Sequence, residues 1–236
     1  MRIAVIIPAY NESESIANVV REVNDLNTIN TSHRFTPVVI NDCSIDNTAS
    51  IIDNIDCVAL HLPVNLGIGG AVQTGYKYAY LQQFDYAVQV DGDGQHPPLF
   101  LPIMLQKMID ENLDVLIGSR FINKLGFQSS VMRRMGIKYF MLLNKWLTGY
   151  IITDNTSGLR MLNKKAIKIA NSYYPDEYPE PESFILFTHS NCTVGEIAVE
   201  MRERQGGVSS ITASSSIYYM AKVTLAIIFT HLRLKK

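Results

Sequence analysis

The sequence contains little cysteine and carries almost no net charge. Its 236 residues include three cysteines, and the formal net charge at pH 7 is −1. Three widely spaced cysteines provide neither a disulfide framework nor a zinc site, so a reducing compartment is expected. The balanced charge gives no general attraction to nucleic acid, and no base-stacking platform or reading helix of a known type is recognisable.

The sequence also lacks an apolar run of the roughly 20 residues that a bilayer-spanning helix needs. The stretch 217–229 is apolar apart from Lys222 and Thr224. We expect it to pack on the domain, to form a homodimer contact or to lie at a membrane interface. Residues 3–7 follow a single basic residue and come with no small-residue cleavage site, which favours a β-strand over a signal peptide. A cytoplasmic protein is expected, with peripheral contact to the inner face of the cell membrane left open.

Short β-branched runs alternate with amphipathic helical patterns along the chain. The runs are 3–7, 38–40, 58–62, 86–90 and 115–117. Strands that alternate with helices predict an α/β fold with a mostly parallel central sheet and helices on both faces. In such sheets ligands bind beyond the carboxyl ends of the strands. We expect one domain over residues 1–210 and an apolar and basic helical tail over 211–236.

Two carboxylates follow one of these runs directly. Asp91 and Asp93 flank Gly92, so both side chains can point to one side of the chain while the glycine lets a ligand approach the backbone. Hard oxygen ligands select Mg²⁺ or Mn²⁺, which often also binds phosphate oxygens. A plain tight turn is the alternative. A calcium loop is excluded, because His96 and Pro102 stand where it needs Gly and Glu.

Polar or glycine-rich segments follow other predicted strands. They are 8–12, 41–48 and 65–71. The first two contain good helix caps, so each is also explained as a helix start. The third is neither a phosphate loop nor a dinucleotide fingerprint, and it predicts either a flexible loop over a nucleotide or a glycine-rich turn.

In their order along the chain these segments closely resemble the motifs of family 2 glycosyltransferases with the GT-A fold. The motifs are Pro-x-Tyr-Asn-Glu at 8–12, Asp-x-Ser-x-Asp-x-Thr at 42–48, Asn-x-Gly-x-Gly-Gly-Ala at 65–71, Asp-x-Asp-x-Gln-His-Pro at 91–97 and Gly-Ser-Arg at 118–120. The pattern is most similar to the polyprenyl-phosphate branch, typified by dolichyl-phosphate mannosyltransferase. Residues 154–160, Glu182, Glu196 and 204–209 extend the resemblance to about residue 210.

The resemblance implies roles for individual residues. The nucleoside pocket would be lined by Pro8, Ala9, Tyr10, Glu12 and Asp42. The glycines Gly67, Gly69 and Gly92 would lie close to the donor. The metal, Mg²⁺ or Mn²⁺, would be held by Asp91, Asp93 and Gln95. Arg120 and Arg204 would bind phosphate, for which a guanidinium provides paired charge-assisted hydrogen bonds. The donor would be a UDP- or GDP-linked sugar.

The resemblance further implies a hexosyltransferase that inverts the anomeric carbon in one displacement, in cell-envelope glycan or polyprenyl-phosphate-sugar synthesis. A lipid phosphate attacks without help, whereas a saccharide hydroxyl needs a carboxylate base. Candidate bases are Asp154, Glu180 and Glu182, and the family spacing favours Glu182. Two prolines are expected to stiffen a loop around the two glutamates. A non-catalytic nucleotide-sugar-binding relative is a more distant alternative.

The sequence departs from the family pattern at two positions. Asn41 replaces an expected Asp, which puts base or sugar contacts in doubt. Ser210 replaces a Lys, which weakens the case for a lipid-phosphate acceptor. Residues 120–153 contain six basic residues and no acidic one, and a helix is predicted over 133–150. This helix would either lie on an anionic membrane or pack on the core with a solvated basic face.

Overall fold

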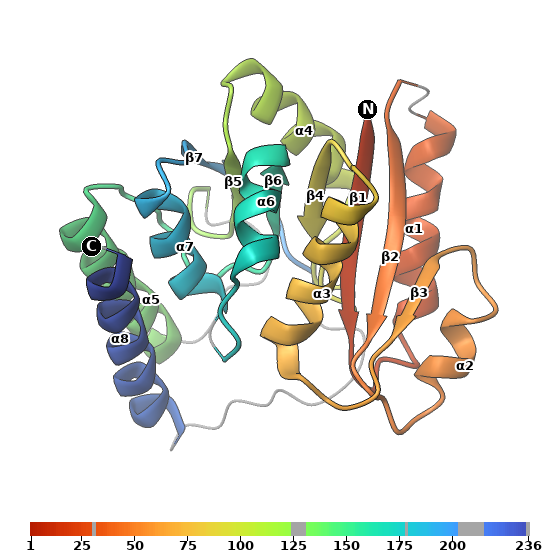
Figure 1. Ribbon diagram of the computed structural model, residues 1–236, viewed down its shortest axis with the longest axis horizontal. Coiled ribbons are helices and arrows are strands. Elements are labelled where there is room, and N and C mark those ends of the chain that lie inside the picture. The colour runs from red at the N-terminus through yellow and green to blue at the C-terminus, as the bar shows by residue number, and fades with distance from the viewer. Residues whose placement is uncertain (30–31, 124–130, 178, 203–214, 235–236) are drawn as a thin grey trace.

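A computed structural model describes residues 1–29, 32–123, 131–177, 179–202 and 215–234 of the protein (Figure 1). Within these residues seven strands form one sheet in the order β3-β2-β1-β4-β6-β5-β7. The strands are β1 (Arg2–Ala9), β2 (Arg34–Asn41), β3 (Val58–His61), β4 (Tyr86–Gln89), β5 (Val115–Ser119), β6 (Arg160–Asn163) and β7 (Val194–Ala198). All neighbouring strands are parallel except β6, which is antiparallel to both β4 and β5. The predicted mostly parallel sheet is confirmed.

Helices cover both faces of the sheet, as predicted. They are α1 (Ile16–Ile29), α2 (Thr48–Ile52), α3 (Gly67–Leu81), α4 (Leu101–Asp110), α5 (Val131–Thr148), α6 (Lys164–Ser172), α7 (Pro179–His189) and α8 (Ser215–Leu234), with a short 3₁₀ turn at Pro98–Phe100. One face packs against α1, α2 and α4, and the other against α3, α6 and α7.

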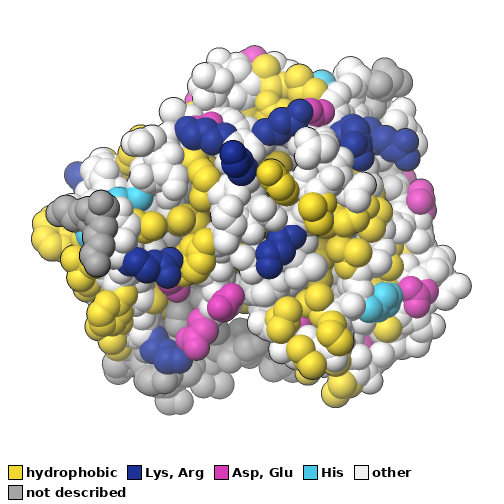
Figure 2. Space-filling view, in the orientation of Figure 1, with side chains coloured by type: hydrophobic (Ala, Val, Ile, Leu, Met, Phe, Trp, Pro, Cys, Tyr) yellow, Lys and Arg dark blue, Asp and Glu magenta, His cyan; other side chains and the backbone are white. Residues whose placement is uncertain are grey.

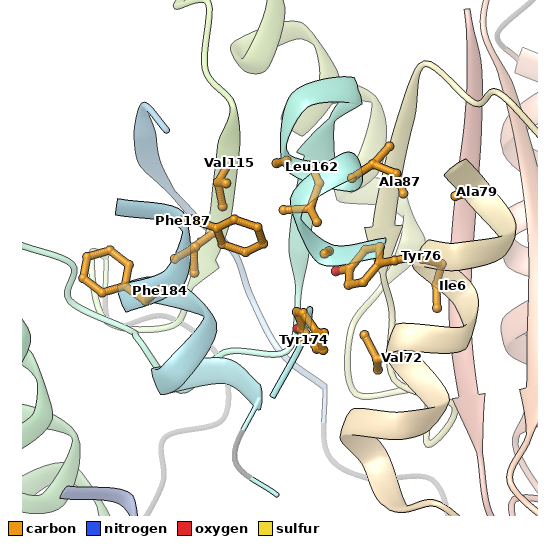
Figure 3. Close-up of a cluster of buried hydrophobic side chains, with 14 of the residues drawn as sticks. Ile6, Val72, Tyr76, Ala79, Ala87, Val115, Leu162, Tyr174, Phe184 and Phe187 are labelled. Atoms are coloured by element: carbon orange, nitrogen blue, oxygen red, sulfur yellow. The ribbon is translucent and has the colours of Figure 1, made fainter. Parts of the chain in front are cut away.

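Side chains alternate between these two layers along each strand. In β1, Ile3, Val5 and Ile7 belong to the core under α1 and α4, whereas Ala4 and Ile6 belong to the core under α3. This alternation follows from the two-residue period of a strand. Figure 3 shows the core under α3, in which aromatic rings of α3, α7 and the segment after α6 meet aliphatic side chains of the strands.

Helices α5 and α8 lie side by side at one end of the molecule (Figure 1). The hydroxyl of Thr224 in α8 donates to the hydroxyl of Tyr139 in α5 at 3.3 Å. Helix α8 also packs on α7, where Thr230 donates to the Glu182 carboxylate at 3.2 Å and the rings of His189 and His231 share a 2.8 Å hydrogen bond. Among the described helices, none combines the length and the hydropathy that a bilayer-spanning helix requires.

Two local expectations were wrong. The segment expected as a flexible glycine loop is already helical, because α3 begins at Gly67. The prolines around Glu180 do not stiffen a loop, because α7 begins at Pro179 and places both Glu180 and Glu182 in its first turn. Proline is tolerated at the start of a helix, where its missing N–H has no partner to lose. The expected domain boundary at residue 210 lies outside the described residues.

Candidate active site

The candidate site lies at the edge of the sheet where β1, β2, β4 and β5 end. Because β6 runs in the opposite direction, the loop before it, 154–159, reaches the same edge. The sheet order therefore brings together most of the segments that the sequence singled out.

The two carboxylates of the metal motif are held differently. The Gln89 amide donates to Asp91 Oδ1 at 3.2 Å, and His96 Nδ1 lies 3.3 Å from Asp91 Oδ2. Asp93 is 4% exposed and accepts from the backbone N–H of Gln95 at 3.0 Å. Burial opposes ionisation of Asp91, but His96 and Gln89 outweigh it and lower its pKa. Asp91 is therefore a carboxylate at neutral pH.

This donor set fits a divalent cation that is shared with a diphosphate. In the described residues no group of three or more His, Cys, Asp or Glu side chains forms a metal cage. Mg²⁺ does not need one, since it typically takes one or two carboxylates and fills its other positions with water and phosphate oxygens. Asp91 and Asp93 would provide two hard oxygen ligands, and the side chain of Asp91 is 32% exposed.

Two glycines allow the backbone to close around Asp91. A Cβ at Gly158 would lie 3.0 and 3.2 Å from the two Asp91 carboxylate oxygens. A Cβ at Gly92 would lie 2.9 Å from the Pro8 carbonyl oxygen at the end of β1. All three distances are shorter than ordinary van der Waals contacts, so a side chain at Gly158 would press on the Asp91 carboxylate and one at Gly92 would press on the end of β1.

The two segments predicted to line the nucleoside pocket follow the ends of the neighbouring strands β1 and β2. Asp42 is 4% exposed, and its Oδ1 accepts from the backbone N–H of Leu66 at 2.7 Å. The aromatic ring of Tyr10 is 47% exposed beside it in the chain segment after β1. Asn41 faces β3 instead, where its amide is 3.1 Å from His61 Nδ1. Asn41, which replaces the Asp of the family pattern, thus contacts a residue of the neighbouring strand.

Arg120 and Asp154 form a buried ion pair. Arg120 Nε and Nη2 donate to the two oxygens of Asp154, both at 2.6 Å, and Asp154 is 0% exposed. A third protein segment holds the pair, because Glu196 of β7 accepts from the backbone N–H groups of Thr153 and Asp154 at 2.8 and 2.9 Å. Burial raises the pKa of Glu196.

The two candidate bases of α7 occupy different environments. Glu182 is 8% exposed and directed to α8. Burial raises its pKa, although the hydrogen bond from Thr230 acts to lower it. Glu180 is half-buried, and burial raises its pKa while Arg160 and Gln89 act against the rise. The charge of Asp91 also raises the pKa of Glu180, so of these two glutamates Glu180 is the one in electrostatic contact with the metal motif.

The arrangement of these motifs is that of a sugar-transferring enzyme family. The family model described as glycosyl transferase family 2 matches residues 4–169. The chain belongs to glycosyl transferase family 2.

Relatives of this glycosyltransferase act on polyprenyl lipids, according to their names. A UDP-N-acetylglucosamine–dolichyl-phosphate N-acetylglucosaminyltransferase of Methanococcus voltae is 30% identical over 221 residues, which is 84% of each chain. A polyprenol monophosphomannose synthase of Mycolicibacterium smegmatis is 26% identical over 236 residues, covering 94% of this chain and 85% of the relative. The expected family and branch are confirmed.

Solved structures confirm the GT-A fold. Glucosyl-3-phosphoglycerate synthase from Mycobacterium tuberculosis, crystallised with Mn²⁺ and UDP-glucose, matches with a TM-score of 0.70 and 15% identity over 97% of this chain and 78% of its own. TarS of S. aureus in complex with UDP-GlcNAc matches with a TM-score of 0.65 and 18% identity over 97% of this chain and 67% of its own. The protein is a nucleotide-sugar glycosyltransferase of the GT-A type.

No role was predicted for Arg160 of this transferase. It is 1% exposed and donates to the Ser157 and Asn155 carbonyl oxygens at 2.9 and 2.6 Å and to the Ser183 hydroxyl at 2.8 Å. It therefore ties the loop before β6 to the first turn of α7. Its position at the end of the motif at 154–160 was the sequence feature that could have indicated a role.

Arg204 lies outside the described residues, so its predicted phosphate contact stays a prediction. Arg202 is described, and its backbone N–H donates to the Gln95 carbonyl at 3.0 Å, while its guanidinium pairs with Glu22 of α1 at 2.7 Å. Arg202 thus lies beside the predicted metal motif.

Proposed function

We propose that the transferase moves a hexose, with inversion, from a UDP- or GDP-sugar to a polyprenyl phosphate at a membrane surface. The supporting observation is a site rich in acidic and basic groups at the sheet edge, combined with exposed apolar helices at one end of the same molecule. The names of the relatives support the acceptor class.

Each part of the site has a proposed task. Pro8, Ala9, Tyr10, Glu12 and Asp42 hold the nucleoside. Asp91, Asp93 and Gln95 hold Mg²⁺ or Mn²⁺, which when bound stabilises the negative charge of the leaving diphosphate. Arg120 lies near enough to Asp91 for their charges to interact, and it supplies positive charge to phosphate oxygens. A phosphate acceptor is already ionised, so this reaction requires no base.

The exposed side chains of α5 and α8 support a membrane location. Trp146 is 79% exposed, Leu142 53%, Phe229 65% and Leu232 57%. Figure 2 shows hydrophobic surface along the edge of the molecule where Figure 1 places these two helices. The exposed lysines Lys138 and Lys145 of α5 add positive charge that anionic lipids attract. The lysines of α5 and the exposed apolar side chains of α5 and α8 together support contact with the inner face of the cell membrane.

Glu180 supports a second acceptor class. A saccharide hydroxyl must lose its proton during transfer, and a carboxylate with a raised pKa beside the donor site suits that role. Glu180 has both properties. Transfer to a saccharide hydroxyl with Glu180 as base is therefore the alternative, and Glu182 and Asp154 are the other carboxylates proposed for it.

Two measurements test the proposal. A thermal-shift screen of UDP-, GDP- and dTDP-sugars with and without Mn²⁺ or Mg²⁺ identifies the donor, since a ligand of the folded state raises the melting temperature. Transfer from that donor to undecaprenyl phosphate or to a saccharide in detergent then identifies the acceptor, and NMR of the product gives its anomeric configuration. Transfer to the saccharide alone, or a product with retained configuration, would contradict the proposal.

A further inference from the structure

We propose that Gln89 is the positioning residue of the metal site, which fixes the Asp91 carboxylate in the orientation that the cation and the donor diphosphate need. This inference rests on the proposed function, because it assumes that Asp91 binds the cation. Gln89 does not touch the substrate in this assignment and acts through Asp91.

The strand geometry brings Gln89 to Asp91. Gln89 is the last residue of β4, and Asp91 follows two positions later, so their side chains point to the same side. Gln89 is 0% exposed, and its Nε2 donates to Asp91 Oδ1 at 3.2 Å. Opposite Gln89 in the β4–β6 pairing is Arg160, which organises the loop that covers Asp91.

The amide of Gln89 has little freedom to move. A Cβ at Gly158 would lie 2.8 Å from Gln89 Nε2, so the backbone of the loop before β6 packs directly against the amide. His96, which is 2% exposed, lies on the other carboxylate oxygen at 3.3 Å. Asp91 therefore has a protein neighbour at each oxygen, a hydrogen bond from Gln89 at one and the buried His96 ring at the other, and a carboxylate has further lone pairs to offer a cation.

A purely structural role explains Gln89 poorly. Within the described part of the chain, no group donates to the buried Gln89 Oε1. A buried amide with an unpaired carbonyl destabilises a fold, and an apolar residue would fill this strand position without that penalty. The Gln89 amide also lowers the pKa of Glu180 by hydrogen bonding, but its contact with Asp91 is the one that bears on the cation. Hydrogen bonds that orient metal-binding side chains are worth about 10–100-fold in metal affinity.

The test compares two identical substitutions in the full chain. Gln89→Met removes the donor and keeps most of the side-chain volume. Gln106→Met is the matched control, because it removes a Gln-to-Asp hydrogen bond on the exposed surface of α4, from Gln106 Nε2 to Asp110 Oδ1 at 2.7 Å. Mn²⁺ binding is measured without turnover, by the electron paramagnetic resonance signal of free Mn²⁺ in the presence of the nucleoside diphosphate chosen by the thermal-shift screen.

We expect Gln89→Met to weaken Mn²⁺ binding by about 10–100-fold and Gln106→Met to leave it unchanged. The Mn²⁺ concentration that half-saturates turnover should rise by the same factor, while kcat at saturating Mn²⁺ stays within a few-fold of wild type. Gly158→Ala, which presses on the same amide and carboxylate, should raise the half-saturating Mn²⁺ concentration too and serves if Gln89→Met does not fold.

Two results overturn the inference in distinguishable ways. Wild-type Mn²⁺ affinity in folded Gln89→Met would refute the role of Gln89 and leave the proposed function intact, whatever Gly158→Ala does, because a Cβ at Gly158 also presses on the Asp91 oxygens directly. Absence of Mn²⁺-dependent nucleotide binding in the wild type would refute the metal assignment itself, and the inference with it.

Discussion

The Arg120 guanidinium and the Asp154 carboxylate neutralise each other through two 2.6 Å hydrogen bonds in a nearly solvent-free part of the protein. Burial alone would lower the pKa of Arg120, but Asp154 more than compensates and raises it. The pair joins the end of β5 to the loop before β6. Any use of Asp154 as a base would first require Arg120 to find another anion, such as a substrate phosphate.

Breaking this pair from one side should destabilise the protein strongly. Asp154→Asn removes the carboxylate charge that both Arg120 nitrogens bind, and breaking a buried ion pair from one side typically costs about 3–5 kcal/mol of unfolding free energy. Replacing both residues, as Arg120→Met with Asp154→Leu, should cost clearly less than the sum of the two single replacements. Urea unfolding of the wild type, Arg120→Met, Asp154→Leu and the double replacement measures this coupling energy. If the losses of unfolding free energy in the two single variants simply add up in the double variant, the pair contributes no mutual stabilisation.

Asp93→Ala should abolish transfer and weaken metal-dependent nucleotide binding while the fold persists. The side chain is nearly buried and small, and it accepts from the backbone N–H of Gln95 in the turn that follows β4. A rate decrease of at least about 10³-fold is expected if the carboxylate holds the cation at the leaving diphosphate. Asp110→Ala on the exposed face of α4 is the control, and normal turnover of Asp93→Ala would remove the residue from the metal site.

Glu182→Gln should stabilise the protein at neutral pH. Burial raises the pKa of Glu182 in the folded state. The stabilisation by this group is therefore complete at pH values below the pKa of the unfolded chain, and it is lost as the pH rises through the pKa of the folded protein. A neutral amide avoids that loss and can still bind Thr230. For a domain of this size each kcal/mol gained raises Tm by about 2–4 °C. Calorimetry at pH 7.5 and pH 4 should show a gain that shrinks at the lower pH.

The activity of the same variant tests the predicted catalytic role of Glu182. Loss of transfer in a protein that is more stable than wild type would identify a functional carboxylate kept at the expense of stability. Full activity would assign Glu182 to the α7–α8 contact, and Glu180→Gln would then be the informative variant for a saccharide acceptor.

The sequence identified the fold and the strand-end segments because both are encoded in local patterns. Alternation of β-branched runs and amphipathic helices predicted the sheet, and the metal motif was visible as two carboxylates after a strand. Pairings between distant segments were not predictable in this way. The partner of Asn41 is His61 in the next strand, and the Asp154 that was proposed as a base is paired with Arg120, 34 residues away.

The helix starts were mispredicted for a related reason. Glycine and proline usually signal loops, yet Gly67 and Pro179 begin α3 and α7. A Cβ at Gly69 would lie 2.1 Å from the Asp176 carbonyl oxygen, so this glycine is required by a contact between α3 and the segment before α7. Such a contact depends on the complete fold and leaves no local pattern.

Replacing apolar side chains on the edge formed by α5 and α8 should detach the protein from membranes. Trp146→Ser and Phe229→Ser each remove a large side chain that makes little protein contact, so stability should change by less than about 0.5 kcal/mol. Each fully buried side chain of this size contributes about 1.5–3 kcal/mol on leaving water, so the double variant should bind anionic vesicles at least tenfold more weakly. Leu81→Ser, at a 70% exposed position of α3, controls for the loss of any exposed apolar group.

Vesicle co-sedimentation at low and high salt separates the apolar part of the attachment from the part due to Lys138 and Lys145, since only the latter is screened. Unchanged binding by the double variant would return α5 to a core-packed helix with a solvated basic face.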